Sequence, residues 1–146
     1  SHDKSKEITE DTVTKQVGIS KEYNVFELQS ALATKNVVKA NQIINYFEGN
    51  IKNNPIIPII SMLFSYFSKV LLVHHNSGKN PNEMAAMLKV HPFFVKEYMT
   101  ASKNYNLGKT LQVIGLLHEA DLKSKGVEST ISEGELMKEL VYQILH

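Results

Sequence analysis

The sequence predicts an all-α protein, a bundle of about six to seven helices preceded by one short helix. Apolar residues recur at spacings of three and four along most of the chain, as on the inner face of a helix. Asn, Ser or Thr stands before many of these segments, where side chains cap helix N-termini. No stretch alternates with a period of two for long enough to suggest a sheet. With 146 residues, 42% of them hydrophobic, we expect one main compact core.

The first predicted helix is short. Thr9 can cap it, Glu10 and Asp11 lie in the first turn where the helix dipole favours acids, and Gly18 ends it. A polar linker then runs to Asn24. We expect Ser1-His2 to be the remnant of an expression tag and the chain to be part of a longer protein.

A helical hairpin should follow. Asn24, with Glu27 three residues later, predicts a capping box for a helix over 25–34. Asn36 is placed to begin a second helix, which Gly49 ends.

The longest predicted helix begins at Asn54-Pro55 and runs to about Asn76. Its apolar side chains should surround most of the circumference: Ile59, Ile60, Met62, Leu63, Phe64, Phe67, Val70, Leu71 and Val73. Lys69 interrupts this run, and the uncharged part falls short of the roughly 20 apolar residues that a bilayer requires. We therefore expect a helix in the middle of the bundle, and not a membrane span.

Two short helices are expected next. Asn80-Pro81 with Glu83 begins one of them, and His91-Pro92 begins the other. Their apolar residues are Met84, Ala85, Met87 and Leu88 in the first, and Val95, Tyr98, Met99 and Ala101 in the second.

Two longer helices should complete the bundle. One runs from about Leu107 to Lys125, with Gly126 at its end and with Glu119 and Asp121 each four residues before a lysine. Ser132 and Glu135 predict a capping box for the last helix.

The charge composition narrows the possible functions. Sixteen basic and fifteen acidic residues leave a formal charge of +1, so no overall field attracts nucleic acid or an anionic membrane. Every basic residue is a lysine, and without arginine the chain lacks the planar donor that reads guanine bidentately or serves as an arginine finger. Without cysteine, neither a disulfide nor a thiolate metal site can form, which fits a reducing compartment.

One motif imitates a nucleotide site. Gly108-Lys109-Thr110 resembles the tail of a phosphate-binding loop, but Lys103 occupies the position of the required first glycine. A helix also precedes this motif where a strand is needed. We interpret it as the first turn of a helix.

A second motif imitates a helix-turn-helix. Ala85, Leu88, Val90 and Val95 have the right spacing, but Lys89 stands at the turn position that usually takes glycine. The helix that would enter the DNA groove has few cations among its aromatic residues: Phe93, Phe94, Tyr98 and Tyr105, with Lys96 and Lys103. Structural packing is the preferred interpretation, and a DNA-binding regulator is the alternative.

The histidines predict no site. His118 and Asp121 share a helix face without a third ligand, and His74-His75 ends a helix, where a cation suits the dipole. His91 is interpreted as a helix-entry residue. We therefore predict no catalytic, cofactor-binding or metal site.

An aromatic stripe is the better candidate for function. Phe94, Tyr98, Ala101 and Tyr105 share one helix face, with Val95, Met99 and Ser102 on a neighbouring one. One helix of a small bundle seldom buries both faces. Core packing is the preferred interpretation and a subunit contact the alternative; which residues contact partners stays open.

The order of several short segments resembles one family, the C-terminal region of the bacterial DNA polymerase III delta subunit, a clamp-loader component. These segments are Ile8-Thr9 with Val13 and Val17-Gly18, Tyr23 to Leu28 with Ala31-Leu32, Met84 to Leu88 with Val90 to Phe93, and Asp121 to Gly126. The resemblance covers nearly the whole chain.

The resemblance implies a division of the chain: residues 1–2 are a tag remnant, 3–22 the end of an AAA+ lid domain with a linker, and 23–146 the helical collar domain. In this family the collar holds the delta subunit in a ring with gamma/tau and delta-prime type subunits. The sliding clamp contacts an N-terminal domain instead. The resemblance thus implies a non-catalytic, cytoplasmic oligomerisation domain that takes part in DNA replication, without a cofactor, a DNA contact or a membrane contact.

Overall fold

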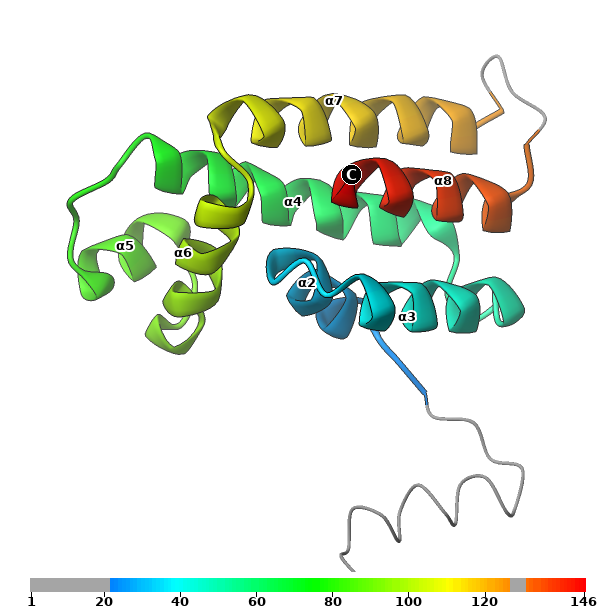
Figure 1. Ribbon diagram of the computed structural model, residues 1–146, viewed down its shortest axis with the longest axis horizontal. Coiled ribbons are helices and arrows are strands. Elements are labelled where there is room, and N and C mark those ends of the chain that lie inside the picture. Colours follow the sequence, from blue (N-terminus) through cyan, green and yellow to red (C-terminus); the bar gives the residue numbers. More distant parts are fainter. Residues whose placement is uncertain (1–21, 127–130) are drawn as a thin grey trace, which may run out of the picture.

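The computed structural model describes residues 22–126 and 131–146, and within these ranges it contains helices and no strand (Figure 1). The predicted all-α class is confirmed. Seven α-helices and one 3-10 helix make up the described part of the bundle. The predicted helix around residues 9–18 lies outside the described residues.

The predicted hairpin is present as α2 (Val25–Ala33) and α3 (Val37–Gly49). The Asn24 side chain accepts a hydrogen bond from the Glu27 N–H at 2.9 Å, and the Glu27 carboxylate accepts one from the Asn24 N–H at 3.1 Å. Asn36 caps α3, and Lys35 makes the turn between the helices in the left-handed region, with φ of 53°. Local capping signals therefore placed both helix starts correctly.

Helix α4 (Ile56–His74) is the central helix, as predicted, and packs against α2, α5, α6 and α7 (Figure 1). By length and composition alone it could cross a membrane, with a mean hydropathy of 2.0, but core helices pass the same test. Its apolar residues are not all covered: Leu63 is fully buried, whereas Phe64 is 44% exposed. The helix is central and apolar around much of its circumference, but part of that apolar surface is not buried within the described part of the bundle.

Helices α5 (Pro81–Leu88) and α6 (Val95–Asn104) are joined by a turn and the 3-10 helix η1 (Pro92–Phe94). Asn80 and Glu83 form the predicted capping box. His91 is a helix-entry residue, as predicted, because its Nδ1 accepts a hydrogen bond from the Phe93 N–H at 3.0 Å.

Helices α7 (Leu107–Ser124) and α8 (Glu133–Leu145) close the bundle. Gly126 ends the first of them with φ of 81°, in the left-handed region that glycine favours. Asp121 pairs with Lys125 at 3.0 Å, but Lys123 lies nearest Glu139 of α8, at 4.0 Å.

The predicted capping box of α8 forms in part. The Glu135 N–H donates to the Ser132 hydroxyl at 3.2 Å, and that hydroxyl in turn faces the Glu135 carboxylate at 3.3 Å. Ser132 therefore caps the helix, while the Glu135 carboxylate bonds the hydroxyl of Ser132 and not its backbone N–H.

Candidate subunit interface

One side of the molecule is formed by the outer surfaces of two long helices, α4 and α7, which lie side by side and antiparallel (Figure 1). Each helix leaves three large apolar side chains between 39% and 51% exposed. We name these six residues the α4–α7 face: Ile57, Phe64 and Leu72 of α4, with Leu107, Leu111 and Leu122 of α7.

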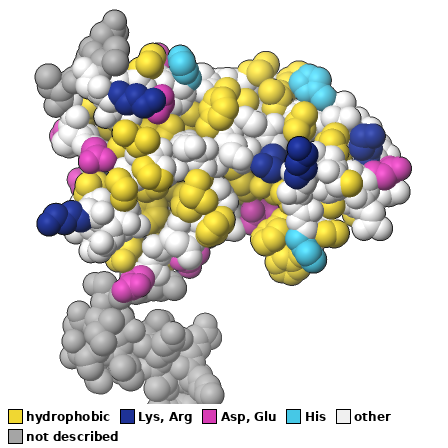
Figure 2. Space-filling model, turned by 180° about the vertical axis from the view of Figure 1, so that it is seen from behind, with side chains coloured by type: hydrophobic (Ala, Val, Ile, Leu, Met, Phe, Trp, Pro, Cys, Tyr) yellow, Lys and Arg dark blue, Asp and Glu magenta, His cyan; other side chains and the backbone are white. Residues whose placement is uncertain are grey.

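The helix period explains why these residues share one surface. Their spacings of seven and eight residues on α4, and of four and eleven on α7, return to the same side of a helix. Figure 2 shows yellow side chains gathered over these helices in the view from behind. Large apolar side chains gathered on one surface are typical of the central part of a protein interface.

A shallow hollow of about 250 Å³ lies between the two helices on this side. It is lined by Ser61 and Phe64 from α4 and by His118 and Asp121 from α7. The predicted neighbours His118 and Asp121 therefore do line one hollow. Within the described ranges, no group of three metal-ligating side chains accompanies them.

A second surface feature is an aromatic groove of about 260 Å³ between α2, α4, η1 and α6. Aromatic side chains and one carboxylate are prominent in its lining: Phe26, Tyr66, His91, Phe94, Glu97 and Tyr98. Phe26 is 62% exposed and Phe94 48%, while Tyr66 and Tyr98 lie stacked beneath, with ring centroids 4.6 Å apart.

Glu97 is the one carboxylate among the lining residues of this groove. It joins three helices: the Tyr66 hydroxyl donates to Glu97 Oε1 at 2.8 Å, and the Ser30 hydroxyl donates to Oε2. Burial, with a smaller contribution from the Glu97 charge, raises the pKa of Tyr98 to about 12 and raises that of Tyr66 further. Both phenols therefore stay protonated and uncharged at neutral pH, and the Tyr66 hydroxyl remains a hydrogen-bond donor.

The predicted aromatic stripe divides between the core and the surface. Tyr105 is fully buried, and its hydroxyl donates to the Leu32 carbonyl at 2.6 Å. Tyr98 is also buried, whereas Phe94 is 48% exposed and its neighbour Phe93 78%. The core interpretation is therefore correct for the two tyrosines, and the phenylalanines remain on the surface.

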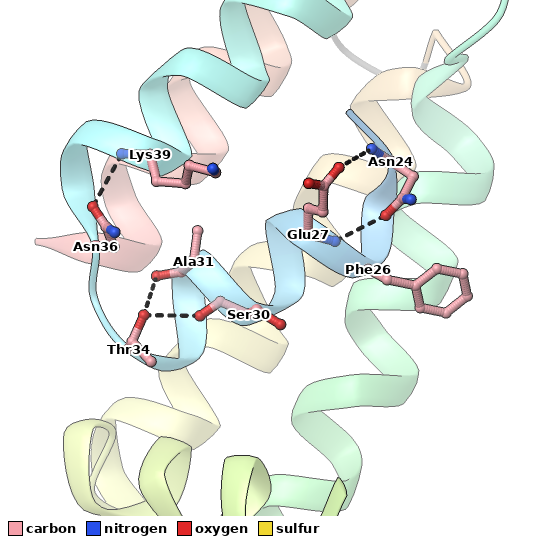
Figure 3. A pocket seen from close by; sticks show the side chains of 8 residues that line it. All are labelled: Asn24, Phe26, Glu27, Ser30, Ala31, Thr34, Asn36 and Lys39. Carbon is pink, nitrogen blue, oxygen red and sulfur yellow. Dashed lines mark hydrogen bonds between the residues drawn. The ribbon is translucent and has the colours of Figure 1, made fainter. Parts of the chain in front are cut away.

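A hollow beside the first hairpin holds polar side chains, but these serve helix ends (Figure 3). Asn24 and Glu27 bond each other's backbone, and Asn36 accepts from the Lys39 N–H at 3.1 Å. Figure 3 shows the Phe26 ring pointing away from these groups. The polar groups do not converge on a common point, so this arrangement suits caps and not a reaction.

The phosphate-loop imitation is the first turn of α7, as interpreted from the sequence. Asn106 caps the helix by accepting from the Lys109 N–H at 2.8 Å, and Lys109 Nζ donates to the Gln143 carbonyl at 3.0 Å. Burial, and secondarily the charge of Lys35, lowers the pKa of Lys109. Thr110 is fully buried and donates to the Tyr105 carbonyl at 2.9 Å.

The helix-turn-helix positions pack as structural residues. Ala85, Leu88 and Val95 are at most 5% exposed and Val90 is partly buried. Lys89 stands at the turn position that usually takes glycine, and it adopts the left-handed conformation with φ of 60°. The turn geometry is thus present although its usual residue is not.

The two adjacent histidines stabilise a helix end. His74 Nε2 lies 2.7 Å from the Tyr105 carbonyl, and His75 Nδ1 lies 3.0 Å from the Leu71 carbonyl. The interpretation of this pair as helix-terminal residues is confirmed.

Sequence reasoning did not find the α4–α7 face, and of the aromatic groove it found Phe94 and Tyr98 but not Phe26 or Glu97. Phe64 was counted with the buried residues of α4, and Glu97 was not singled out. No local signal marked Glu97, since its partners Ser30 and Tyr66 are distant in the sequence.

The described part of the chain is a helical bundle with two partly exposed apolar surfaces. The family model of the DNA polymerase III delta subunit, C-terminal domain, matches residues 22–143. The chain belongs to this family, which confirms the resemblance. Among curated proteins and among solved structures, no significant match was found.

Proposed function

We propose that this chain is the collar domain of a bacterial clamp-loader delta subunit, and that it holds the subunit in the loader ring by packing helices against neighbouring collars. The family match supports the setting. The observation that carries the mechanism is the α4–α7 face, with six large apolar side chains left partly exposed on two adjacent helices.

The proposed division is a tag remnant at 1–2, the end of an AAA+ lid with a linker at 3–22, and the collar at 23–146. The partners are gamma/tau and delta-prime type subunits in the cytoplasm, and the sliding clamp is contacted by the N-terminal domain of the full-length subunit. This domain makes no covalent change in a substrate. Its contribution is to position that clamp-binding domain during DNA replication.

Burial of apolar surface would supply the binding free energy. Full burial of a Leu, Ile or Phe side chain contributes about 1.5–3 kcal/mol, and these six side chains are already half covered by their own bundle. The remaining contribution is a fraction of that for each residue, part of which offsets the entropy lost on association. An interface of standard size is therefore needed, and six residues would form only its centre.

Co-purification with the partner loader subunits tests this function. The wild-type chain should enter their complex at micromolar concentration. The Phe64→Glu variant should not enter it, because the new carboxylate would be buried in the interface without a partner. Val38→Glu is the matched control, since Val38 is 69% exposed on α3 and lies away from the α4–α7 face. A wild-type chain that never joins the complex would rule out the collar function.

If Val38→Glu prevents assembly and Phe64→Glu does not, the collar function stands but the α4–α7 face is the wrong surface. The two results are therefore distinguishable.

The alternative function is a DNA-binding regulator, and the left-handed turn at Lys89 is the observation in its favour. Against it, the exposed rings of Phe93 and Phe94 in η1 lie at the entry to the second helix, whose cations are Lys96 and Lys103. Fluorescence anisotropy with duplex DNA at low salt separates the two. Tight binding that falls steeply with salt, and that is lost on substitution of both lysines, would favour the regulator.

A further inference from the structure

The aromatic groove carries a negative charge that the described part of the protein does not neutralise. Both oxygens of Glu97 accept from neutral hydroxyls, those of Tyr66 and Ser30. Across residues 22–126 and 131–146, no lysine or histidine nitrogen lies within ion-pairing distance of this carboxylate. Each carboxylate oxygen can accept a second hydrogen bond, so acceptor positions remain for an incoming donor.

The walls of the groove present aromatic rings to solvent. Phe26 and Phe94 line it from α2 and η1, and both are about half exposed or more. Phe93, outside the groove, supports Phe94 edge-on, with ring centroids 5.3 Å apart. An exposed aromatic ring close to a carboxylate favours a bound cation in two ways: the cation interacts with the ring face, and it pairs with the opposite charge of the carboxylate.

A guanidinium fits these two features better than an ammonium does. It is planar and weakly hydrated, so it can stack on a ring while its parallel N–H groups reach a carboxylate. The 146 residues contain no arginine, and a second copy of them contains none either. A guanidinium would therefore have to come from outside these residues.

We propose that the aromatic groove binds an arginine-bearing segment of a partner protein, with the guanidinium against Phe94 and paired with Glu97. The α4–α7 face has no role in this contact, so the proposal is independent of the collar function. The structural role of Glu97 as a bridge between α2, α4 and α6 explains its two hydroxyl partners, but it does not explain aromatic rings left in solvent beside a charge.

Fluorescence anisotropy with two peptide pools tests the proposal on the full chain. One pool consists of fluorescein-labelled heptapeptides with a central arginine and randomised apolar flanks. The other has citrulline, which keeps the shape and removes the charge. The arginine pool should bind at least tenfold more tightly, and Glu97→Gln should abolish that preference. Glu119→Gln, which removes an exposed carboxylate of α7, is the control and should leave it unchanged.

Two further measurements keep the test decisive. If Glu97→Gln impairs folding, Phe94→Ala replaces it as the test variant. The Phe94 side chain is half exposed, so its removal should leave the melting temperature near wild type. The same substitution should lower the affinity for the arginine pool at least threefold. Equal binding of both pools, no binding of either, or equal binding of a lysine pool would overturn the proposal. So would a dimer of the chain, seen by analytical ultracentrifugation, that Phe94→Ala dissociates, because a second copy would then fill the groove.

Discussion

The α4–α7 face and the aromatic groove are both apolar and partly exposed, but they differ in how polar groups are arranged. The face is formed by aliphatic side chains and one phenylalanine along two helices, without a charged residue among its six members. The groove is smaller and places one carboxylate among aromatic rings. A broad, largely apolar surface suits packing against another helical domain, whereas a single anchored charge suits recognition of one particular side chain.

Both surfaces depend on α4, which explains the difference between them. Leu63, Phe67 and Val70 fill the core, while Tyr66 turns its hydroxyl toward α6 and Phe64 points outward. One helix thus supplies a wall of the groove on one side and half of the face on another. Four predictions separate these two surfaces.

The largest expected effect is a loss of stability at alkaline pH that depends on the groove. In the unfolded chain the phenol of Tyr98 ionises with a pKa of 10.0, and burial in the folded state raises that pKa to about 12. The folded state therefore binds more protons between these values, so the free energy of unfolding falls as pH rises from about 10 to 12. The slope should reach about 1.4 kcal/mol per pH unit for each such tyrosine.

Urea unfolding at pH 9, 10 and 11 measures this loss. Tyr98→Phe should flatten the slope, and the same sign applies to Tyr66 and Tyr105, whose pKa values burial also raises. Phe64→Ser of the α4–α7 face should keep the wild-type slope. Identical slopes for wild type and Tyr98→Phe would show that the groove is open to water.

The second prediction concerns assembly. Replacing Phe64 and Leu111 together by alanine should weaken binding to partner loader subunits about 100-fold, because both side chains would lie at the centre of the buried patch. Phe26 and Phe94 replaced together serve as the control, and should leave assembly within about threefold of wild type. Surface plasmon resonance on immobilised partner subunits measures both. A larger loss from the groove pair would reverse the roles of the two surfaces.

The third prediction concerns the support of Glu97. Tyr66→Phe removes the hydroxyl that donates to the carboxylate at 2.8 Å, and a hydrogen bond to a charged group contributes about 1.5–3 kcal/mol. Urea titration at pH 7 should show a loss in that range. Tyr142→Phe, at a ring that is 64% exposed, should cost less than about 0.5 kcal/mol. Equal losses would mean that the Tyr66 hydroxyl is free to bond water instead.

The smallest effect is expected at Phe93. Phe93→Ala should change the free energy of unfolding by less than about 0.5 kcal/mol, because the ring is 78% exposed. Phe47→Ala, at a fully buried ring, should cost about 3–5 kcal/mol by the same urea titration. A substantial loss at Phe93 would indicate that its edge-on contact with Phe94 holds the groove wall in place.

Local signals predicted the helices well because their determinants are close in the sequence. Asn24 with Glu27, and Asn80 with Glu83, form the capping boxes that their spacing indicates. The start of α4 shows the limit of this reasoning. Its first N–H, at Ile56, donates to the Glu133 carboxylate of α8 at 3.0 Å, a contact across 77 residues that no local pattern marks.

The aromatic residues show the same limit. Helical spacing placed Phe94, Tyr98 and Tyr105 on one stripe, yet Tyr105 lies in the core beside Phe67 and Phe94 lies in solvent. Periodicity identifies a face but does not say what covers it.

The sequence by itself determined the all-α class and the helix starts, because capping and apolar periodicity act over three or four residues. The order of its short segments also indicated the delta-subunit family, which the family match confirms. The tertiary structure alone decided which apolar residues of α4 stay exposed and which partners Glu97 has. Those outcomes depend on how helices from distant parts of the chain pack against one another.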